Sequence, residues 1–271
     1  MKQLFQIADE TGAEYFQPVL SLWIGEKHIS FAISDFNSKK VKQIVWDSAE
    51  EVNDSSLEEW YSFHPEVRDD FSKIQIGYNF PQSTLVSAGD FQQDQSKEIL
   101  RGFSGINDSS IIISDTLIEW QLVNTYAIPA YVHNWVIKKF PGASFKNQYT
   151  VNIKSGNIAY AGGSFIIDFR PEEFSVIVLK EGRLILAQTY SYLVPDDVIY
   201  YLMKIVHQYS FSQKEVLIQL SGLIDRQSAL FKELYQYFIN IEFREGEWSL
   251  PVSDYPTHFF TSLNDLAKCV L

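Results

Sequence analysis

The sequence predicts an α/β protein made of two halves that repeat one order of strands and helices. Three β-rich runs joined by short turns occupy residues 19–48, and a second set of three occupies residues 164–192. In each half a helical pattern follows the third run, and a further strand follows that helix. A chain of 271 residues also exceeds the usual size of one domain, which favours two lobes.

The first half opens with an antiparallel meander, because short turns separate the runs VLSLWIG, ISFAISD and VKQIVWDS. Ser56 and Glu59 have the spacing of a capping box, so we expect a helix to begin there. Pro65 should end that helix near His64. The later patterns predict a strand at 73–80, a short helix at 95–103, one or two strands within 109–128, and a helix at 129–140.

The second half contains the runs SFIIDF, EFSVIVLK and RLILAQTYSY, followed by a helix. Asp196 and Asp197 suit the positive start of that helix. Its apolar positions recur at helical spacing, at Val198, Leu202, Ile205 and Tyr209. A strand at 216–220, a helix at 228–238 and a strand at 239–243 complete the order βββαβαβ.

The composition indicates a folded protein with a net negative charge. Hydrophobic residues make up 46% of the chain, enough for a packed core. Lys and Arg number 22 against 34 Asp and Glu, a net charge of −12, so we expect no binding to nucleic acid. No apolar run has the length of a membrane span, and we expect a cytoplasmic protein without membrane insertion. Cys269 is the single cysteine and the 5 His lack metal-binding spacing, so we expect no metal site.

The repeated order, with SFIIDF entering a hairpin and LIQLSG entering a helix, resembles the duplicated ribonuclease-H-like fold of the actin-like ATPase superfamily. That resemblance implies mixed sheets and two lobes around an interlobe cleft, with an N-terminal lobe at 1–125 that carries inserted elements and a C-terminal lobe at 126–271. The runs STLVSAGDF and TYAIPAYVHNWVIKKFPGASF resemble more closely an uncharacterised Bacteroidetes family that is assigned this fold. The pilus and secretion assembly proteins of the superfamily are more distantly similar.

The resemblance also identifies two strand-to-strand turns where members of the superfamily hold the phosphates of ATP. In each turn an Asp directed at magnesium is followed two residues later by a Gly, whose open backbone lets amides approach phosphate. In the first half Gly25 is present, but Trp23 stands where the Asp belongs. The first magnesium-directed carboxylate is therefore missing.

In the second half Asp168 stands where the Asp belongs, but Arg170 replaces the Gly. Pro171 has no amide donor, and Glu172 and Glu173 place negative charge where phosphate would lie. Each like-charge pair at about 4 Å costs on the order of 4 kcal/mol at an effective dielectric near 20. This repulsion exceeds the stabilisation that the remaining amide contacts to phosphate would contribute. Arg170 could bind an anion, although its glutamate neighbours favour a salt-bridged surface residue.

The loop that contacts adenosine in this superfamily corresponds to LSGLIDRQS. Ser221 and Gly222 match the start of the family pattern, but Leu223 replaces the second Gly. A nucleoside-sized cleft could survive here, although Ser-Gly after a strand is also ordinary turn chemistry. The candidate remnant of a nucleotide site consists of Gly25, Asp168, Arg170, Ser221 and Gly222.

These substitutions favour a nonhydrolytic protein of the actin-like ATPase fold that binds protein partners or serves as a scaffold. We expect no catalytic residue, no metal and no cofactor beyond weak binding of ATP or a nucleoside. The Tyr-rich stretch 189–211 would suit an interface with a partner, and homo-oligomerisation stays open. One alternative is an ATPase or small-molecule kinase with a divergent magnesium site. A second is a nucleoside-binding module built on Ser221 and Gly222.

Overall fold

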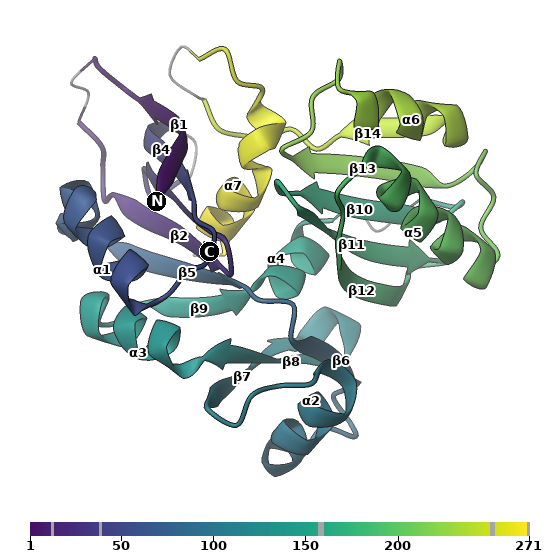
Figure 1. Cartoon of the computed structure of the whole chain (residues 1–271), viewed down its shortest axis with the longest axis horizontal. Helices are drawn as coiled ribbons and strands as arrows, with labels where there is room; N and C mark the ends of the chain where they lie inside the picture. Colours follow the sequence, from purple (N-terminus) through teal and green to yellow (C-terminus); the bar gives the residue numbers. More distant parts are fainter. Residues whose placement is uncertain (12–13, 38–39, 157–159, 250–252, 270–271) are drawn as a thin grey trace. The chain divides into compact units, whose positions relative to one another are not determined.

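The computed structural model describes residues 1–11, 14–37, 40–156, 160–249 and 253–269 (Figure 1). It divides into two compact units. Unit 1 comprises Met1–Val151, Glu247–Asp254 and Leu263–Leu271, and unit 2 comprises Asn152–Gly246 and Tyr255–Ser262. The boundary that the sequence suggests, between residues 125 and 126, lies inside a strand of unit 1, β8 (Leu122–Pro129), so the compact units follow different bounds. An arrangement of two lobes around a cleft stays a prediction.

Unit 1 is built on a six-stranded mixed sheet in the order β1-β4-β3-β2-β5-β9. The meander predicted over residues 19–48 is confirmed, and β2 pairs in parallel with β5, which pairs in parallel with β9. An unpredicted strand, β1, pairs antiparallel with β4. The strands are β1 (Lys2–Ala8), β2 (Val19–Gly25), β3 (His28–Ser34), β4 (Val41–Ser48), β5 (Lys73–Asn79) and β9 (Ser144–Asn147).

The helix after this meander, α1 (Asp54–Phe63), begins earlier than the sequence suggests. The Asn53 side chain accepts a hydrogen bond from the Ser56 amide at 3.0 Å, and the Ser56 hydroxyl accepts one from the Asn53 amide at 2.8 Å. The capping box is therefore Asn53 with Ser56, and the expected box of Ser56 with Glu59 is wrong. Asn caps a helix as well as Ser does, so the chain gains almost one further turn of helix. The expected end near His64 is confirmed.

Between β5 and β9 the chain forms a second, three-stranded sheet in the order β6-β8-β7. The predicted strand at 73–80 and the helices at 95–103 and 129–140 are confirmed, and residues 109–128 supply two strands. The short elements β6, β9 and α4 were not predicted. The inserted and following elements are β6 (Ser83–Ser87), α2 (Ser96–Ser104), β7 (Ser110–Leu117), β8, α3 (Ala130–Lys139) and α4 (Gln148–Ser155).

Unit 2 confirms the predicted order βββαβαβ in a five-stranded sheet, β12-β11-β10-β13-β14. Along this sheet, β12 pairs with β11 and β11 with β10 in antiparallel fashion, whereas β10 pairs with β13 and β13 with β14 in parallel. The strands β4-β3-β2-β5-β9 of unit 1 follow the same sequence of antiparallel and parallel pairs. The chain thus contains one topology twice. The elements are β10 (Ser164–Phe169), β11 (Glu173–Lys180), β12 (Arg183–Ser191), α5 (Pro195–Gln208), β13 (Leu217–Gly222), α6 (Ala229–Tyr237) and β14 (Asn240–Phe243). The last helix, α7 (Thr261–Lys268), has its first two residues in unit 2 and the rest in unit 1.

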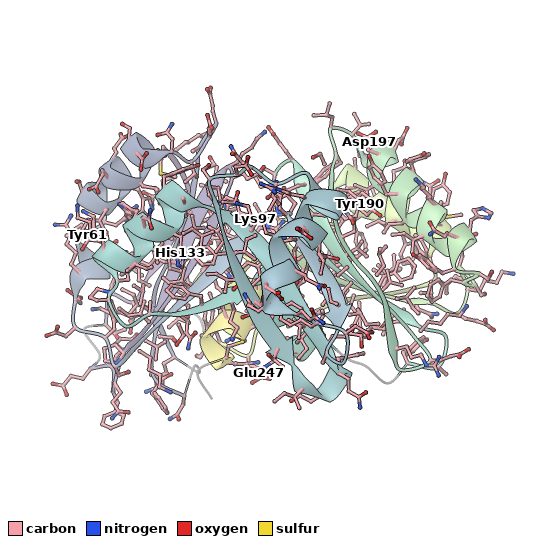
Figure 2. All side chains as sticks on the ribbon, turned by 90° about the horizontal axis from the view of Figure 1, so that it is seen from below. Tyr61, Lys97, His133, Tyr190, Asp197 and Glu247 are labelled. Carbon is pink, nitrogen blue, oxygen red and sulfur yellow. The ribbon has the colours of Figure 1, made fainter. Side chains whose placement is uncertain are left out.

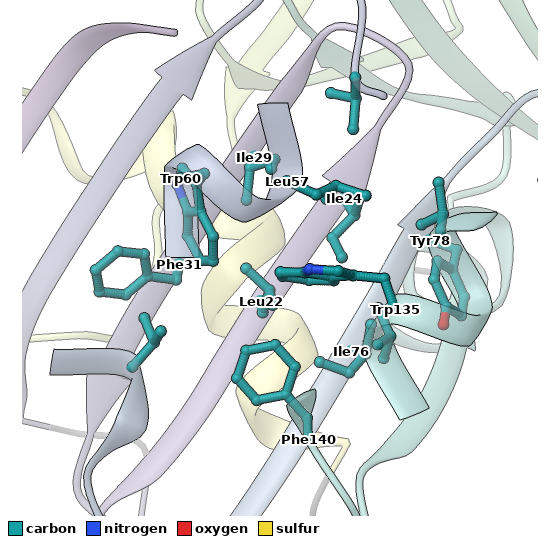
Figure 3. Packing of buried hydrophobic residues seen from close by; sticks show 14 of the residues in the cluster. Leu22, Ile24, Ile29, Phe31, Leu57, Trp60, Ile76, Tyr78, Trp135 and Phe140 are labelled. Atoms are coloured by element: carbon teal, nitrogen blue, oxygen red, sulfur yellow. The ribbon is translucent and has the colours of Figure 1, made fainter. Parts of the chain in front are cut away.

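Each unit has its own hydrophobic core on one face of its main sheet. In unit 1, Leu22 and Ile24 of β2 pack with Trp60 of α1 and Trp135 of α3 (Figure 3). Because side chains alternate along a strand, the residue between them, Trp23, faces the opposite side of the sheet. In unit 2 the core is formed by alternate residues of β10 and β11 together with α5 and α6. Among the described residues no helix is long and apolar enough to cross a membrane.

A buried polar cluster fastens α1 to the meander of unit 1. The His64 ring nitrogens lie 2.9 Å from Asp47 Oδ2 and 3.1 Å from Glu66 Oε1. The Trp60 indole also donates to Asp47 Oδ2, at 3.0 Å. Burial lowers the pKa of His64, but its hydrogen bonds to Asp47 and Glu66 raise it, and the net pKa lies above the ordinary value. Protonated His64 therefore stabilises the fold.

Replacing His64 with Gln should make the stability of this protein less dependent on pH. A raised folded-state pKa adds stability that is complete below the ordinary pKa of about 6.5 and is lost as the pH rises through the raised value. The wild type should exceed His64→Gln in unfolding free energy by more at about pH 6 than at about pH 8.5. Urea titrations at both values measure the difference, and His207→Gln, at an exposed position, is the control. An equal difference at both pH values would contradict the assigned pairing.

Candidate functional site

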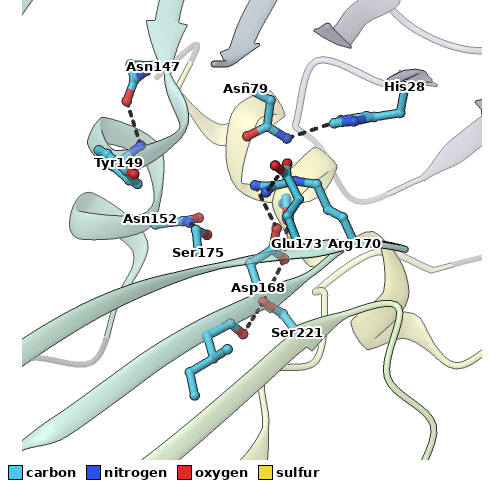
Figure 4. Close-up of polar contacts among 12 residues, drawn as sticks. His28, Asn79, Asn147, Tyr149, Asn152, Asp168, Arg170, Glu173, Ser175 and Ser221 are labelled. Carbon is cyan, nitrogen blue, oxygen red and sulfur yellow. Dashed lines mark hydrogen bonds and ion pairs between the residues drawn. The ribbon is translucent and has the colours of Figure 1, made fainter. Parts of the chain in front are cut away.

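Asp168 lies near the end of β10, where parallel pairing places it beside Ser221 of β13. Its side chain faces away from the core of unit 2, and the residue is 3% exposed. The Asp168 Oδ1 atom accepts hydrogen bonds from the Ser221 hydroxyl at 2.9 Å and the Ser262 hydroxyl at 2.6 Å. Its Oδ2 atom lies 3.6 Å from Arg170 Nη2 (Figure 4). Both carboxylate oxygens therefore already have partners within unit 2.

Arg170 follows β10 and is buried, with 2% of its surface exposed. The expectation that it is salt-bridged is confirmed, since its Nη1 donates to Glu173 Oε1 at 2.9 Å. The expectation that it lies on the surface is wrong. The turn is closed by the Arg170 amide, which donates to the Glu173 carbonyl at 2.8 Å, and this closure directs the guanidinium inward between two carboxylates.

The carbonyl of Arg170 is fixed by Tyr192, which follows β12. The Tyr192 hydroxyl donates to this carbonyl at 2.8 Å, and the Tyr192 amide donates to the Glu172 carbonyl at 2.9 Å. Burial raises the pKa of Tyr192 to about 12, so the phenol keeps its proton and its donor role at neutral pH. The turn that corresponds to a phosphate loop is therefore also held by the residue that follows β12.

Ser221 and Gly222 end β13, directly beside the end of β10. Gly222 has a φ of +78°, and a Cβ atom at this position would collide with the Phe169 carbonyl. The next amide, that of Leu223, donates to the same carbonyl at 2.8 Å. The close approach of two strands thus explains the glycine, and the Ser221 hydroxyl is engaged by Asp168.

In unit 1 the equivalent positions are filled by aromatic rings. Trp23 is 3% exposed and pairs in register with Gly77, where a Cβ atom would collide with the indole. Gly25, which ends β2, has no room for a Cβ either, because the buried imidazole of His28 lies against it. The His28 ring is held by Asn79, at 3.1 Å between His28 Nε2 and Asn79 Nδ2 (Figure 4). Groups of unit 1 itself occupy the space that these glycines leave.

The site residues therefore divide between the two units. Asp168, Arg170, Ser221 and Gly222 lie together at the carboxyl ends of β10 and β13 in unit 2, whereas Gly25 belongs to unit 1. Sequence reasoning missed Ser262, which is 94 residues from its partner Asp168. It also missed His28, for which the glycine three residues earlier was the only available signal. Within the described part of the chain, no group of three or more His, Cys, Asp or Glu gathers to hold a metal ion.

The pairing of Arg170 with Asp168 can be tested with a double-mutant cycle. Arg170→Met leaves two carboxylates without their buried cation and should cost about 3 to 5 kcal/mol of unfolding free energy. Adding Asp168→Asn should recover part of this loss, because a buried neutral amide needs no cation. Urea unfolding measures all four proteins, and Arg183→Met, at the exposed start of β12, is the matched control. Additive effects of the two substitutions would show that the two side chains do not interact.

Comparison with solved structures identifies the fold. The chain is similar to a Bacteroides thetaiotaomicron protein with actin-like ATPase fold and unknown function, at 17% identity and a TM-score of 0.76, covering 93% of this chain and 96% of that one. It is also similar to a chain of the PilM–PilN type IV pilus biogenesis complex, at 12% identity and a TM-score of 0.57, covering 93% of this chain and 98% of that one. The ethanolamine utilization protein EutJ from Carboxydothermus hydrogenoformans matches at 10% identity and a TM-score of 0.51, covering 96% and 92%.

These similarities establish that the chain has the actin-like ATPase fold, as the sequence predicts. At such low identities they carry nothing beyond the fold. No curated protein matches the chain. The model of the family described as "Protein of unknown function (DUF3822)" matches residues 14–241, most of the chain, and the protein therefore belongs to that family.

Proposed function

We propose that this protein is a nonhydrolytic member of the actin-like ATPase fold that acts by binding a protein partner. The observation that carries the proposal is the closed state of the Asp168 turn. Its carboxylate is engaged by two hydroxyls and a guanidinium, all within unit 2. A carboxylate that serves a magnesium ion needs an open side toward that ion, and this one is buried at 3% exposure.

Opening the turn to admit a polyphosphate would be energetically unfavourable. Arg170 would have to leave Asp168 and Glu173, and separating a buried cation from its partners costs several kcal/mol. Pro171 offers no amide in return, and the exposed Glu172 repels phosphate. The residues present therefore do not fit magnesium with ATP.

The space at the corresponding turn of unit 1 is also filled. Trp23 occupies the position of the first carboxylate and lies against Gly77. The imidazole of His28 occupies the space beside Gly25. An indole and an imidazole packed at these places favour a protein that acts by binding through its surface rather than by catalysing a reaction at these turns.

Two further observations support a partner protein. One of the similar solved structures is a complex, the PilM–PilN type IV pilus biogenesis complex, and this supports a role in binding a protein. The present chain exposes several large apolar side chains, Leu193 at 88% and Tyr200 at 63% among them. The net charge of −12 disfavours nucleic acid as the partner. We propose that the protein acts in the cytoplasm.

Calorimetric titration with ATP and magnesium tests the proposal. The wild type should bind ATP no more tightly than about 1 mM, or −4 kcal/mol, and should release no phosphate above background. Micromolar binding with phosphate release would instead support the alternative of an ATPase or kinase with a divergent magnesium site. Binding of adenosine and ATP with equal affinity would support the nucleoside-binding module.

A variant with a reopened turn provides the matched comparison. Arg170→Gly, Pro171→Gly, Glu172→Gly and Glu173→Thr together restore amide donors and remove two negative charges, so ATP should bind measurably more tightly than to the wild type. Adenosine affinity should not change. Glu233→Gln, which makes the same change in net charge on α6, is the control and should leave ATP binding at the wild-type level. Unchanged ATP affinity in the reopened variant would show that this turn is not what excludes phosphate.

A further inference from the structure

β12 forms one edge of the sheet of unit 2. It pairs with β11 on one side, and no strand among the described residues pairs with its other side. An edge strand presents backbone donors and acceptors to which a further strand can bind. The opposite edge, β14, has 4 residues against the 9 of β12. β12 is therefore the edge of this sheet with the length to hold another strand.

The devices that usually prevent strand addition are confined to the start of β12. Arg183 is its first residue, and the irregular register lies early in the strand, opposite Val178 and Leu179. The rest of the strand, LILAQTYS, contains no charged residue and no proline. Most of its side chains are half-buried rather than fully buried, and Gln188 is exposed. This edge is unprotected over most of its length.

An exposed apolar surface continues from the end of β12 onto α5. Leu193 is 88% exposed, Val194 50% and Tyr200 63%. Leu193 and Val194 are held in place, because their amides donate to Asp197 Oδ2 at 2.9 Å and 3.1 Å. Because the backbone of these two residues is already ordered, covering them with a partner costs little further backbone entropy. These residues therefore have the properties of a preformed anchor site.

Stacked tyrosines connect this anchor site to the strand edge. Tyr190 of β12 and Tyr201 of α5 lie with ring centroids 4.3 Å apart, and Tyr200 lies 5.4 Å from Tyr201. Figure 2 shows Tyr190 and Asp197 in the same part of unit 2. A strand placed against β12 would cover the exposed side of these rings. Aromatic rings with a polar tip are typical of the centre of protein interfaces.

The charged residues around this surface indicate which charges a strand bound to β12 should carry. Glu172 and Asp196 are exposed beside the Leu193 end, whereas Arg183 and Lys204 are exposed elsewhere on β12 and α5. A partner with basic side chains at the Leu193 end is therefore complementary. A second copy of this chain is not, because each copy has a net charge of −12.

We propose that the β12 edge, together with Leu193, Val194 and Tyr200, binds an extended basic segment of a partner protein, which joins the sheet of unit 2 as an additional strand. This inference rests on the proposed function and names the surface through which it acts. Backbone hydrogen bonds along β12 supply affinity, and the anchor site fixes the register of the bound segment.

The test uses three synthetic peptides of about nine residues, the length of β12. The first alternates valine with lysine or threonine, the second has the same composition with its valines grouped at one end, and the third carries glutamate in place of lysine. At up to about 1 mM, the first should bind, as fluorescence anisotropy shows, and should protect the backbone amides of residues 183–191 from hydrogen exchange. No protection of these amides would overturn the proposal, as would equal binding of all three peptides.

Variants of the chain locate the contact. Leu193→Ser with Tyr200→Ser should weaken binding of the first peptide by about tenfold or more, whereas Ile239→Ser, a 63% exposed position beside β14, should not change it. Gln188→Lys should weaken and Gln188→Glu should strengthen binding, because the two variants differ in charge at one exposed position. Equal effects of these two variants would contradict a basic strand at this edge.

The outcome is separable from that of the ATP titrations. Micromolar ATP binding with phosphate release would contradict the proposed nonhydrolytic function, but it would not change the result of the peptide experiment. A wild-type dimer in solution that Gln188→Lys disrupts would show instead that the occupant of β12 is a second copy of the chain.

Discussion

A buried guanidinium at the end of β10 determines the geometry of the most informative turn in this protein. Arg170 is almost inaccessible to water, so its charge needs carboxylates at short range. Asp168 and Glu173 supply them from the two strands that the turn connects. Tyr192 then holds the carbonyl of Arg170, and Ser221 and Ser262 satisfy the oxygen of Asp168 that Arg170 does not contact. The orientations of the Asp168 and Glu173 carboxylates thus depend on one cation.

The two units fill the corresponding buried position of their main sheets with different kinds of side chain. Position 168 lies between two neighbouring strands on the face away from the core, and a charged residue there must be neutralised. Position 23 has the same place in the topology of unit 1 and carries an indole, which needs a small neighbour, Gly77, rather than a counter-ion. An ion pair and an aromatic ring both fill the space beside a strand end. The repeated topology therefore does not require repeated chemistry.

Much of the fold could be predicted because it depends on local patterns. The runs of β-branched and aromatic residues identified both meanders, and the spacing of apolar residues identified α5 and α6. The elements that were missed are short, as β9 is, or depend on a distant partner, as β1 depends on β4. The start of α1 was misplaced because Asn53 and Ser56 can both cap a helix, and only the folded chain selects one.

The candidate site could be predicted only in part for a similar reason. Asp168 and Ser221 followed from their places in the motif, but the contact of Ser262 with Asp168 joins residues 94 positions apart. The burial of Arg170 was also hidden, because two neighbouring glutamates suit an exposed residue as well as a buried one. What decides between them is the closure of the turn by the backbone of Arg170 and Glu173.

The unprotected edge of β12 also affects the tendency of this protein to aggregate in solution. At neutral pH the net charge of −12 keeps molecules apart, and this repulsion protects an edge strand that has few local safeguards. As acid protonates the carboxylates, the long-range repulsion fades while the backbone groups of β12 keep their capacity to pair. Mildly acidic solutions with added salt are therefore the conditions in which this chain would form aggregates by edge-to-edge pairing, even while each molecule is still folded.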